Sequence, residues 1–158
     1  MATKRRVSEL FSWPAPALNS PPTVGQVLID LMGAGGWGGA EPWSYKAADI
    51  APTIVGGSLK HGGPDLGPVR ARKAWSKLGV DGLGIANVAP DPSFEGDPRL
   101  TLRMVARLQG FPDDWEFSGK KTKAYRQVGN AFPPPVAKAM GRQLLECIGT
   151  AQLALMEA

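Results

Sequence analysis

Apolar residues recur at helical spacing near the start of the chain, between residues 23 and 32. Val24, Val27, Leu28 and Leu31 stand at i, i+3, i+4 and i+7, as on one face of an α-helix. The preceding Thr23 and the Gln three positions later fit a capping box, in which side chains satisfy free backbone N–H groups. We therefore predict a short helix that begins after Thr23 and ends near Met32.

Two further segments show the same spacing between a start signal and a stop signal. After Gly67-Pro68, apolar residues stand at i, i+3, i+4 and i+7, namely Ala71, Ala74, Trp75 and Leu78, and Gly79 follows as the stop. Farther on, Thr101 can cap a helix that Gly110 ends. Leu100 and Val105 flank this cap at the positions of a hydrophobic staple.

The longest apolar stripe follows a run of prolines. Gly129-Asn130 predicts a turn, and Pro133 to Pro135 preset the backbone for a first helical turn. In the helix predicted from Pro134, four apolar residues stand four apart: Val136, Met140, Leu144 and Ile148. The start of this helix would present free N–H groups and the Asn130 amide to hydroxyls or an anion, unless the loop caps itself.

Short extended segments and loops fill the rest of the pattern. The β-branched triplet at 53–55 predicts a strand that runs into glycines, and 80–85 predicts a turn that leads to a second short strand. The glycine-rich run 33–39 and the lysine-rich run 118–123 lack an apolar pattern and are predicted to be loops. Helices with short strands predict an α+β fold, built around a small mixed domain.

Composition and charge narrow the class of protein. The chain has 158 residues with 20 Gly and 15 Pro, a net charge of +4 and a pI near 9.4, which favours a polyanionic partner without requiring one. One cysteine excludes an internal disulfide framework, and one histidine with one distant cysteine makes a metal site improbable. Without a membrane-length apolar run or a signal-peptide core near Met1, we expect a cytoplasmic protein with no membrane partner.

Two segments carry a family resemblance. RLTLRMVARLQGFPDDW (99–115) resembles the ninth ordered motif of DNA cytosine-5 methyltransferases, and YRQVGNAFPPPVAKAMG (125–141) resembles the tenth. In that family the tenth motif lines the S-adenosylmethionine pocket of a Rossmann-like catalytic domain, and the ninth supports the target-recognition domain. The resemblance implies cofactor contacts by Asn130, Ala131 and Phe132. It implies support roles for Arg103, Arg107, Gln109 and Gly110.

The catalytic motifs of this family do not occur in the sequence. It contains no Pro-Cys pair for the nucleophile loop, no Glu-Asn-Val and no glycine-rich cofactor loop after a first strand. Its single cysteine, Cys147, lies in the predicted final helix, where a buried structural thiol is expected. No catalytic residue is therefore assigned, and the chain alone is expected not to transfer a methyl group.

Candidate DNA contacts fall in one loop and on one helix. Thr53-Ile54 resembles a Thr-Leu pair of the family's target-recognition domain, and a loop carrying Ser58, Lys60 and His61 follows. These side chains suit phosphate oxygens and guanine edges, although a lone loop histidine is commonly only solvated. On the helix after Pro68, Arg70 and Lys73 can neutralise phosphates, with a solvated basic face as the equal alternative.

These observations predict an organisation and a function. We expect an N-terminal arm (1–22), a target-recognition domain (23–98), a ninth-motif helix and turn (99–118) and a tenth-motif segment with the final helix (119–158). The final helix would complete a Rossmann-like catalytic domain supplied by another chain, as in a split restriction-modification methyltransferase. The expected partners are double-stranded DNA and that catalytic subunit. The alternatives are a stand-alone sequence-specific DNA-binding module and a degenerate remnant with neither property.

Overall fold

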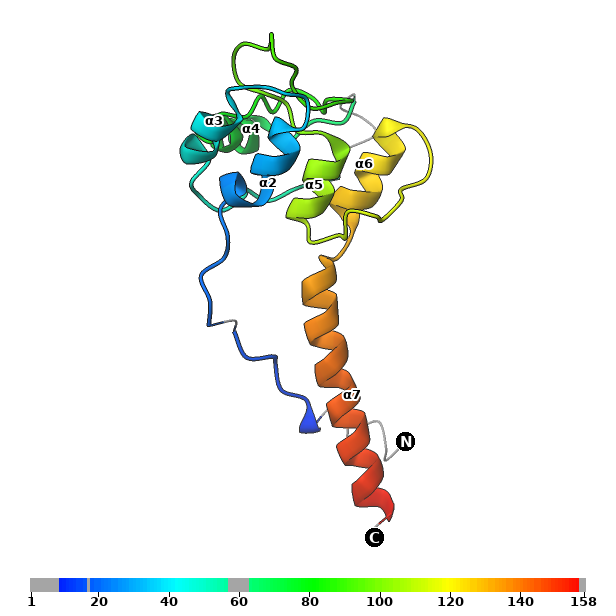
Figure 1. Ribbon diagram of the computed structural model, residues 1–158. Coiled ribbons are helices and arrows are strands. Elements are labelled where there is room, and N and C mark those ends of the chain that lie inside the picture. Colours follow the sequence, from blue (N-terminus) through cyan, green and yellow to red (C-terminus); the bar gives the residue numbers. More distant parts are fainter. Residues whose placement is uncertain (1–8, 17, 57–62, 157–158) are drawn as a thin grey trace. The chain divides into compact units, whose positions relative to one another are not determined.

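The computed structural model describes residues 9–16, 18–56 and 63–156 (Figure 1). Six of its helices are, in chain order, α2 (Val24–Gly33), α3 (Ala40–Lys46), α4 (Val69–Lys77), α5 (Leu102–Leu108), α6 (Lys121–Asn130) and α7 (Pro134–Met156). The chain divides into two compact units. The larger unit is Pro21–Ala131. The other, called the α7 unit below, combines Met1–Ser20 with Phe132–Ala158.

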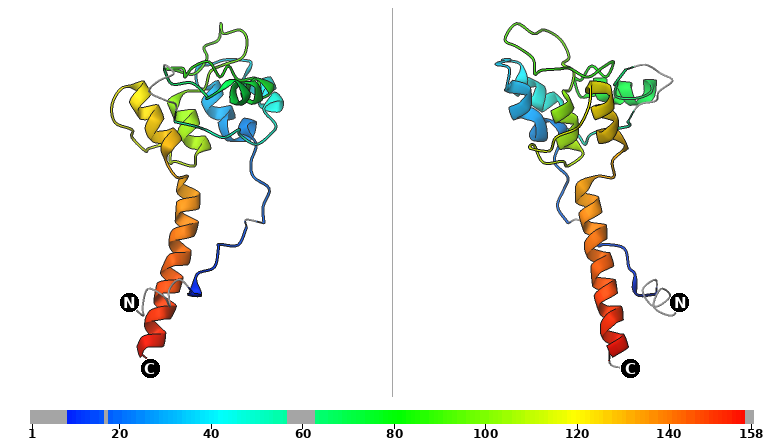
Figure 2. Two further views of the ribbon diagram at one scale, coloured as in Figure 1. Left: turned by 180° about the vertical axis from the view of Figure 1, so that it is seen from behind. Right: turned by 90° about the vertical axis from the view of Figure 1, so that its right-hand side faces the viewer.

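The larger unit is built from short helices around a single core. Figure 2 shows α2, α5 and α6 side by side in both of its views. The fully buried side chains come from these helices, from α4 and from the segments between them; they include Leu28, Met32, Leu66, Trp75, Leu100, Met104, Val105, Tyr125 and Val128. Helices α2 and α3 approach so closely that a Cβ atom at Gly25 would lie 2.1 Å from the backbone oxygen of Ser44.

No β-strand occurs in the described ranges, so the β part of the predicted α+β fold is not found there and the structure is mostly helical. One isolated parallel bridge joins Ala86 to Thr101. The predicted strand at 53–55 is irregular backbone. The segment 80–85 holds only a turn and irregular backbone, and the bridge lies at the residue after it, Ala86. A sheet needs adjacent segments with continuous donors and acceptors, and glycines and prolines interrupt the neighbouring stretch 82–98.

The capped helices predicted from sequence are present. The Thr23 hydroxyl accepts from the Gln26 backbone N–H at 3.3 Å, and the Thr23 N–H donates to the Gln26 side chain at 2.9 Å. Thr101 caps α5 by accepting from the Met104 N–H at 3.3 Å. Helix α4 begins after Pro68 and is followed by Gly79 at φ +66°.

Helices α3 and α6 were missed by the sequence analysis. The predicted loop at 118–123 was wrong from Lys121 onward, and the predicted turn at Gly129-Asn130 was wrong, because α6 runs from Lys121 to Asn130. Its buried stripe is only Ala124, Tyr125 and Val128, which lysines and a glycine conceal in the sequence. In α3, Ala40 and Trp43 supply the buried side, and the Trp43 ring N–H donates to the Gly79 carbonyl at 2.9 Å.

The α7 unit buries one face of its long helix against the N-terminal segment. Cys147 is 4% exposed, Ala151 is 1% exposed, and the Cys147 Sγ lies 3.4 Å from the Leu10 carbonyl oxygen. The prediction of a buried thiol is confirmed. Within the described ranges, α7 and the other helices lack the combination of length and apolar character needed to cross a membrane.

Candidate functional site

The corner at the end of α6 is formed by close packing against the segment that ends at Gly56. A Cβ atom on Gly129 would lie 2.5 Å from both the N and the Cα of Gly56. A Cβ atom on Gly56 would lie 2.1 Å from the Asn130 side-chain oxygen. Backbone atoms cannot give way to such a contact, so this packing needs glycine at 129, whereas a side chain at position 56 would force the Asn130 side chain to move. Gly56 is the last described residue before the predicted DNA loop, and the Asn130 side chain therefore lies against the base of that loop.

Residues of the ninth-motif segment fix this corner from the other side. The Gln109 side-chain amide donates to the Val128 carbonyl at 3.2 Å, and the Ala131 N–H donates to the same carbonyl at 3.2 Å. These bonds satisfy a carbonyl of the last turn of α6 that the helix itself leaves free. Gly110, at φ +86°, ends α5 and lets the chain turn back beside α6.

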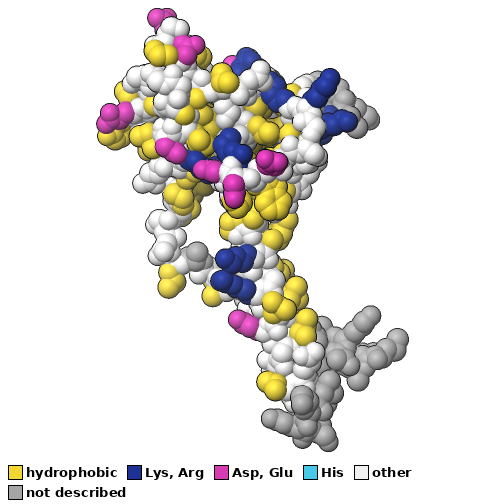
Figure 3. All heavy atoms as spheres, turned by 45° about the vertical axis from the view of Figure 1, so that its right-hand side comes forward, with side chains coloured by type: hydrophobic (Ala, Val, Ile, Leu, Met, Phe, Trp, Pro, Cys, Tyr) yellow, Lys and Arg dark blue, Asp and Glu magenta, His cyan; other side chains and the backbone are white. Residues whose placement is uncertain are grey.

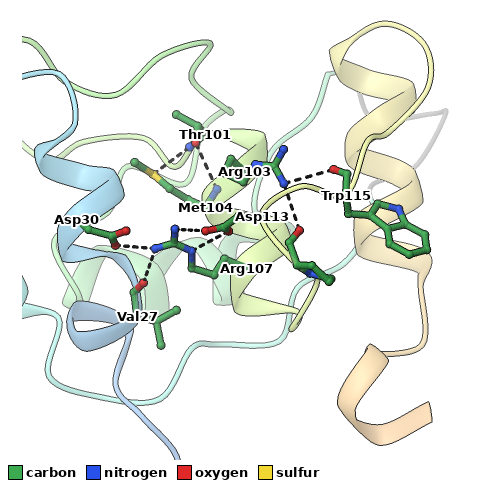
Figure 4. A network of polar contacts seen from close by, with 9 residues as sticks. Val27, Asp30, Thr101, Arg103, Met104, Arg107, Asp113 and Trp115 are labelled. Atoms are coloured by element: carbon green, nitrogen blue, oxygen red, sulfur yellow. Dashed lines mark hydrogen bonds and ion pairs between the residues drawn. The ribbon is translucent and has the colours of Figure 1, made fainter. Parts of the chain in front are cut away.

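A guanidinium ties α2, α5 and the following turn together (Figure 4). Arg107 donates to an Asp30 carboxylate oxygen at 2.6 Å and to the Val27 carbonyl at 3.2 Å. Its remaining N–H groups bind both carboxylate oxygens of Asp113, one of them at 2.9 Å. The hydrogen bonds from Arg107 hold the pKa values of Asp30 and Asp113 below their usual range.

A second arginine of α5 holds the aromatic turn that follows. Arg103 donates to the Pro112 carbonyl at 3.2 Å and to the Trp115 carbonyl at 3.3 Å (Figure 4). The four residues expected to have support roles, Arg103, Arg107, Gln109 and Gly110, thus all position α5 or its neighbours. Their contacts lie within the larger unit.

The predicted cofactor residues lie at the end of α6 and in the segment that follows it. Asn130 is exposed and Ala131 is half-buried in the larger unit, and the Phe132 ring, in the α7 unit, is 61% exposed. The predicted set of free N–H groups at the start of α7 is smaller than expected. Pro133 to Pro135 carry no N–H, and the Ala137 N–H is bonded to the Pro133 carbonyl. Of the first turn, only the Val136 N–H remains as a donor without an intrahelical partner.

The predicted DNA contacts are only partly described. Thr53 is exposed, and Arg70 and Lys73 are exposed on α4. Ser58, Lys60 and His61 lie outside the described residues. The segment of Thr53 passes close to the start of α4, because a Cβ atom on Gly67 would lie 2.9 Å from a methyl group of Val55. The structure therefore brings the Thr53 segment near the N-terminal end of α4, where Arg70 lies.

Other polar groups have surroundings that the sequence did not predict. Tyr125 and Trp75 are fully buried, and their side-chain polar atoms have no hydrogen-bond partner among the described residues. Burial, with a smaller contribution from Asp65, raises the pKa of Tyr125 to about 12. Lys120 and Lys123 belong to the lysine-rich run 118–123 noted in the sequence; Lys120 immediately precedes α6, Lys123 lies in its first turn, and both are exposed. Among described residues, no cluster of three His, Cys, Asp or Glu side chains could hold a metal ion.

Comparisons with known proteins identify relatives of the whole chain. It is 55% identical over 147 residues to the Type II methyltransferase M.NaeI of Lentzea aerocolonigenes, which covers 91% of this chain and 35% of the relative. It is 48% identical over 151 residues to the Type II methyltransferase M.NgoMIV of Neisseria gonorrhoeae, covering 94% of this chain and 47% of the relative. The chain thus spans about a third to a half of the length of these relatives. No solved structure is significantly similar to it.

A shorter similarity and a family model agree with these relatives. DNA (cytosine-5)-methyltransferase 2 of Arabidopsis thaliana is 54% identical over 54 residues, which cover 34% of this chain and 4% of that protein. The family model described as C-5 cytosine-specific DNA methylase matches residues 65–146, which include α4, α5, α6 and the Gly129-Asn130 corner. The chain belongs to the C-5 cytosine-specific DNA methylase family and corresponds to the C-terminal part of such an enzyme.

Proposed function

We propose that this chain is the DNA-recognition part of a DNA cytosine-5 methyltransferase that uses S-adenosylmethionine. One observation carries the proposal most directly. In a chain of the methylase family, the Gly129-Asn130 corner packs on Gly56, immediately before the predicted DNA loop. The residues proposed to bind the cofactor and the loop proposed to bind DNA thus both start at the contact between Gly129 and Gly56 in the larger unit.

The residues after α6 have chemistry that suits the cofactor. The exposed Asn130 amide can donate to and accept from hydroxyl groups, and the exposed Phe132 ring offers an apolar face to a purine. Asn130, Ala131 and Phe132 would form one wall of the pocket, and a catalytic partner would supply the rest. S-adenosylmethionine supplies the electrophilic methyl group of the reaction.

The nucleophile must come from the catalytic partner. Cys147 is buried on α7 beside the N-terminal segment, and a buried thiol beside a carbonyl oxygen has neither the access nor the cationic neighbour that activates cysteine. In the assembled enzyme the target cytosine leaves the base stack, because its C5 cannot be reached within the duplex. A partner thiolate then adds to C6 and makes C5 nucleophilic toward the methyl group.

Helix α4 provides the candidate phosphate contacts whose role can be tested directly. Arg70 and Lys73 form no ion pair among the described residues, and each is exposed. Each phosphate contact contributes about 0.9 to the slope of log binding constant against log salt. We expect Arg70→Gln and Lys73→Gln each to flatten that slope. A slope unchanged in both variants would remove α4 from the interface.

A reconstitution assay tests the function as a whole. The purified chain is incubated with duplex DNA and radiolabelled S-adenosylmethionine, with and without a catalytic partner that carries the Pro-Cys loop. We expect labelled DNA only when both proteins are present. Labelling by the chain alone would disprove the proposal, whereas DNA binding without reconstituted methylation would support a stand-alone DNA-binding module.

A further inference from the structure

We infer that the basic face at the start of α6, formed by the exposed Lys120 and Lys123 with the half-buried Arg126, is a second contact for the DNA sugar-phosphate backbone, separate from α4. This inference rests on the proposed function, because it assigns an additional surface to the same DNA partner. In Figure 3, dark blue Lys and Arg side chains gather at the upper right of the drawn face, the side on which Figure 1 places α6.

The fold does not use the charges of this basic face. Within the described part of the chain, the ion-paired cations are Lys46, Arg99 and Arg107, and none belongs to α6. Residues 120–130 contain no Asp or Glu, so no acidic neighbour lies one turn away along the helix. Lys121 differs from the others, because its amino group donates to the Ile85 carbonyl at 2.8 Å and so has a structural role.

Helix electrostatics also gives no reason for lysines at these positions. Lys120 is the residue that precedes α6, and Lys121 and Lys123 lie in its first turn. The start of a helix carries a partial positive charge, so cations there repel it and weaken the helix. A bound polyanion offsets this repulsion, because it attracts both the lysines and the positive end of the helix. The arrangement therefore suits a bound phosphate chain better than it suits the isolated helix.

The geometry of α6 directs the basic face away from the core and toward the cofactor corner. Ala124, Tyr125 and Val128 are buried on one side of the helix. Lys120, Lys123 and Gln127 are exposed at i, i+3 and i+7 on the other side, and Asn130 continues this stripe. A DNA strand that follows the stripe would thus lead to the residue proposed to contact S-adenosylmethionine.

The length of the basic face matches a short piece of one DNA strand. Residues 120–126 span about 9 Å along the axis at a helical rise of about 1.5 Å per residue. Consecutive phosphates of one strand rise by about 3.4 Å. Three long, flexible cationic side chains can therefore reach two or three neighbouring phosphates without regard to base sequence.

Salt-dependent binding of the full chain to a duplex of arbitrary sequence tests the inference. We expect the double variant Lys120→Gln/Lys123→Gln to lower the magnitude of the log–log salt slope by about 1.8, or about 0.9 for each lost contact. Lys120→Arg/Lys123→Arg should keep the wild-type slope. The control is Lys46→Gln, which removes a single charge at the end of α3, where Lys46 is paired with Asp97, and should leave the slope unchanged.

Acetylation of the unmodified chain gives a second measurement that does not depend on any variant. Saturating duplex DNA should slow acetylation of Lys120 and Lys123 and leave that of Lys46 unchanged, as read by peptide mass spectrometry. An unchanged slope in the double glutamine variant, together with unprotected Lys120 and Lys123, overturns the inference while the α4 contacts stand. Absence of salt-sensitive DNA binding by the unmodified chain overturns the proposed function and this inference with it.

Discussion

At the scale of single residues, two glycines fix the corner proposed to contact the cofactor. Gly56 and Gly129 have no side chain to hold apart the two segments that meet there. The sequence showed the Gly-Asn pair as part of a family motif, but it could not show Gly56 as its contact. That contact joins residues more than seventy positions apart, and residue spacing carries no signal for it.

We expect Gly129→Ala to destabilise the larger unit. The added Cβ would lie 2.5 Å from backbone atoms of Gly56, which cannot move aside as a flexible side chain can. Overpacking of this kind costs roughly 1–3 kcal/mol and outweighs the gain of about 1 kcal/mol from replacing a helical glycine. Chemical denaturation measures the difference.

The control for this substitution is Gly141→Ala in α7. A Cβ atom there meets nothing within 4 Å, so the helix should gain roughly 0.5–1 kcal/mol. A Gly129→Ala variant as stable as the wild type would show that the corner is looser than described.

A second prediction at this scale concerns the buried phenol of Tyr125. Its pKa of about 12 lies above the unfolded value near 10, so the neutral form is favoured in the folded state. The resulting stability is fully present below about pH 10 and is lost as pH rises toward 12. We expect Tyr125→Phe to unfold less readily than the wild type across this range. At pH 7 it should be more stable by roughly 1 kcal/mol, because it removes a buried hydroxyl without a described partner.

Denaturant midpoints between pH 7 and 12 check this prediction. Tyr45→Phe is the matched control, since the Tyr45 side chain is 74% exposed and the same oxygen is removed. Parallel pH profiles for the Tyr125→Phe variant and the wild type would contradict the assignment of the alkaline loss to Tyr125.

At the scale of elements, the sequence identified those helices whose signals are local. Helices α2 and α5 have a capping threonine and apolar residues at helical spacing, and both signals lie within a dozen residues. Helix α6 was missed because its first turn is rich in lysine and its last turn contains Gly129. Its formation depends on burial of Tyr125 and Val128 against the rest of the unit, which is a tertiary effect.

Arg107 connects elements that the sequence presents as separate. We expect Arg107→Gln to lower the free energy of unfolding by roughly 1–3 kcal/mol, because several charge-assisted hydrogen bonds are lost together. The stability of the variant should also change less with pH in the acidic range. The lowered pKa values of Asp30 and Asp113 stabilise the fold above about pH 4, and this stabilisation is lost as pH falls through the folded values.

Unfolding midpoints from pH 7 down to pH 2.5 measure both effects. Arg99→Gln serves as the control, because it removes a more exposed single ion pair with Asp81 and should cost less than about 1 kcal/mol. Equal losses in the two arginine variants would mean that Arg107 does not connect the elements as its contacts indicate.

At the scale of the whole molecule, the family and the motif residues could be found from the sequence, whereas the arrangement of the molecule could not. The absence of strands in the described ranges and the division into two units follow from packing between distant segments. The α7 unit leaves a large apolar surface uncovered, visible as yellow side chains along the helix in Figure 3. The exposed members include Phe132, Val136, Leu144, Leu145, Ile148 and Leu153.

We expect the apolar surface of α7 around Leu145 to bind the catalytic partner of the proposed function. Leu145 is 70% exposed, and Leu145→Lys places a charge where the partner would bury the side chain. Affinity for the partner should fall at least about tenfold, which corresponds to about 1.4 kcal/mol. Titration of the partner in the methylation assay gives the affinity.

Thr150→Lys adds the same charge at an exposed polar position that lies about 140° around α7 from Leu145, and it should leave the affinity unchanged. Thermal unfolding of the larger unit should be the same in both variants. Equal affinities of the Leu145→Lys variant and the wild type would exclude this face as the partner's binding surface.

The solitary, buried thiol of Cys147 has a practical consequence. Its sulfur is covered by the N-terminal segment at Leu10, so an alkylating reagent can reach it only while that cover is open. The rate of alkylation in the native chain therefore measures how often the segment detaches from α7. Because the chain has no other cysteine, this measurement needs neither a mutation nor an attached probe, and a bound protein that holds the segment in place would slow it.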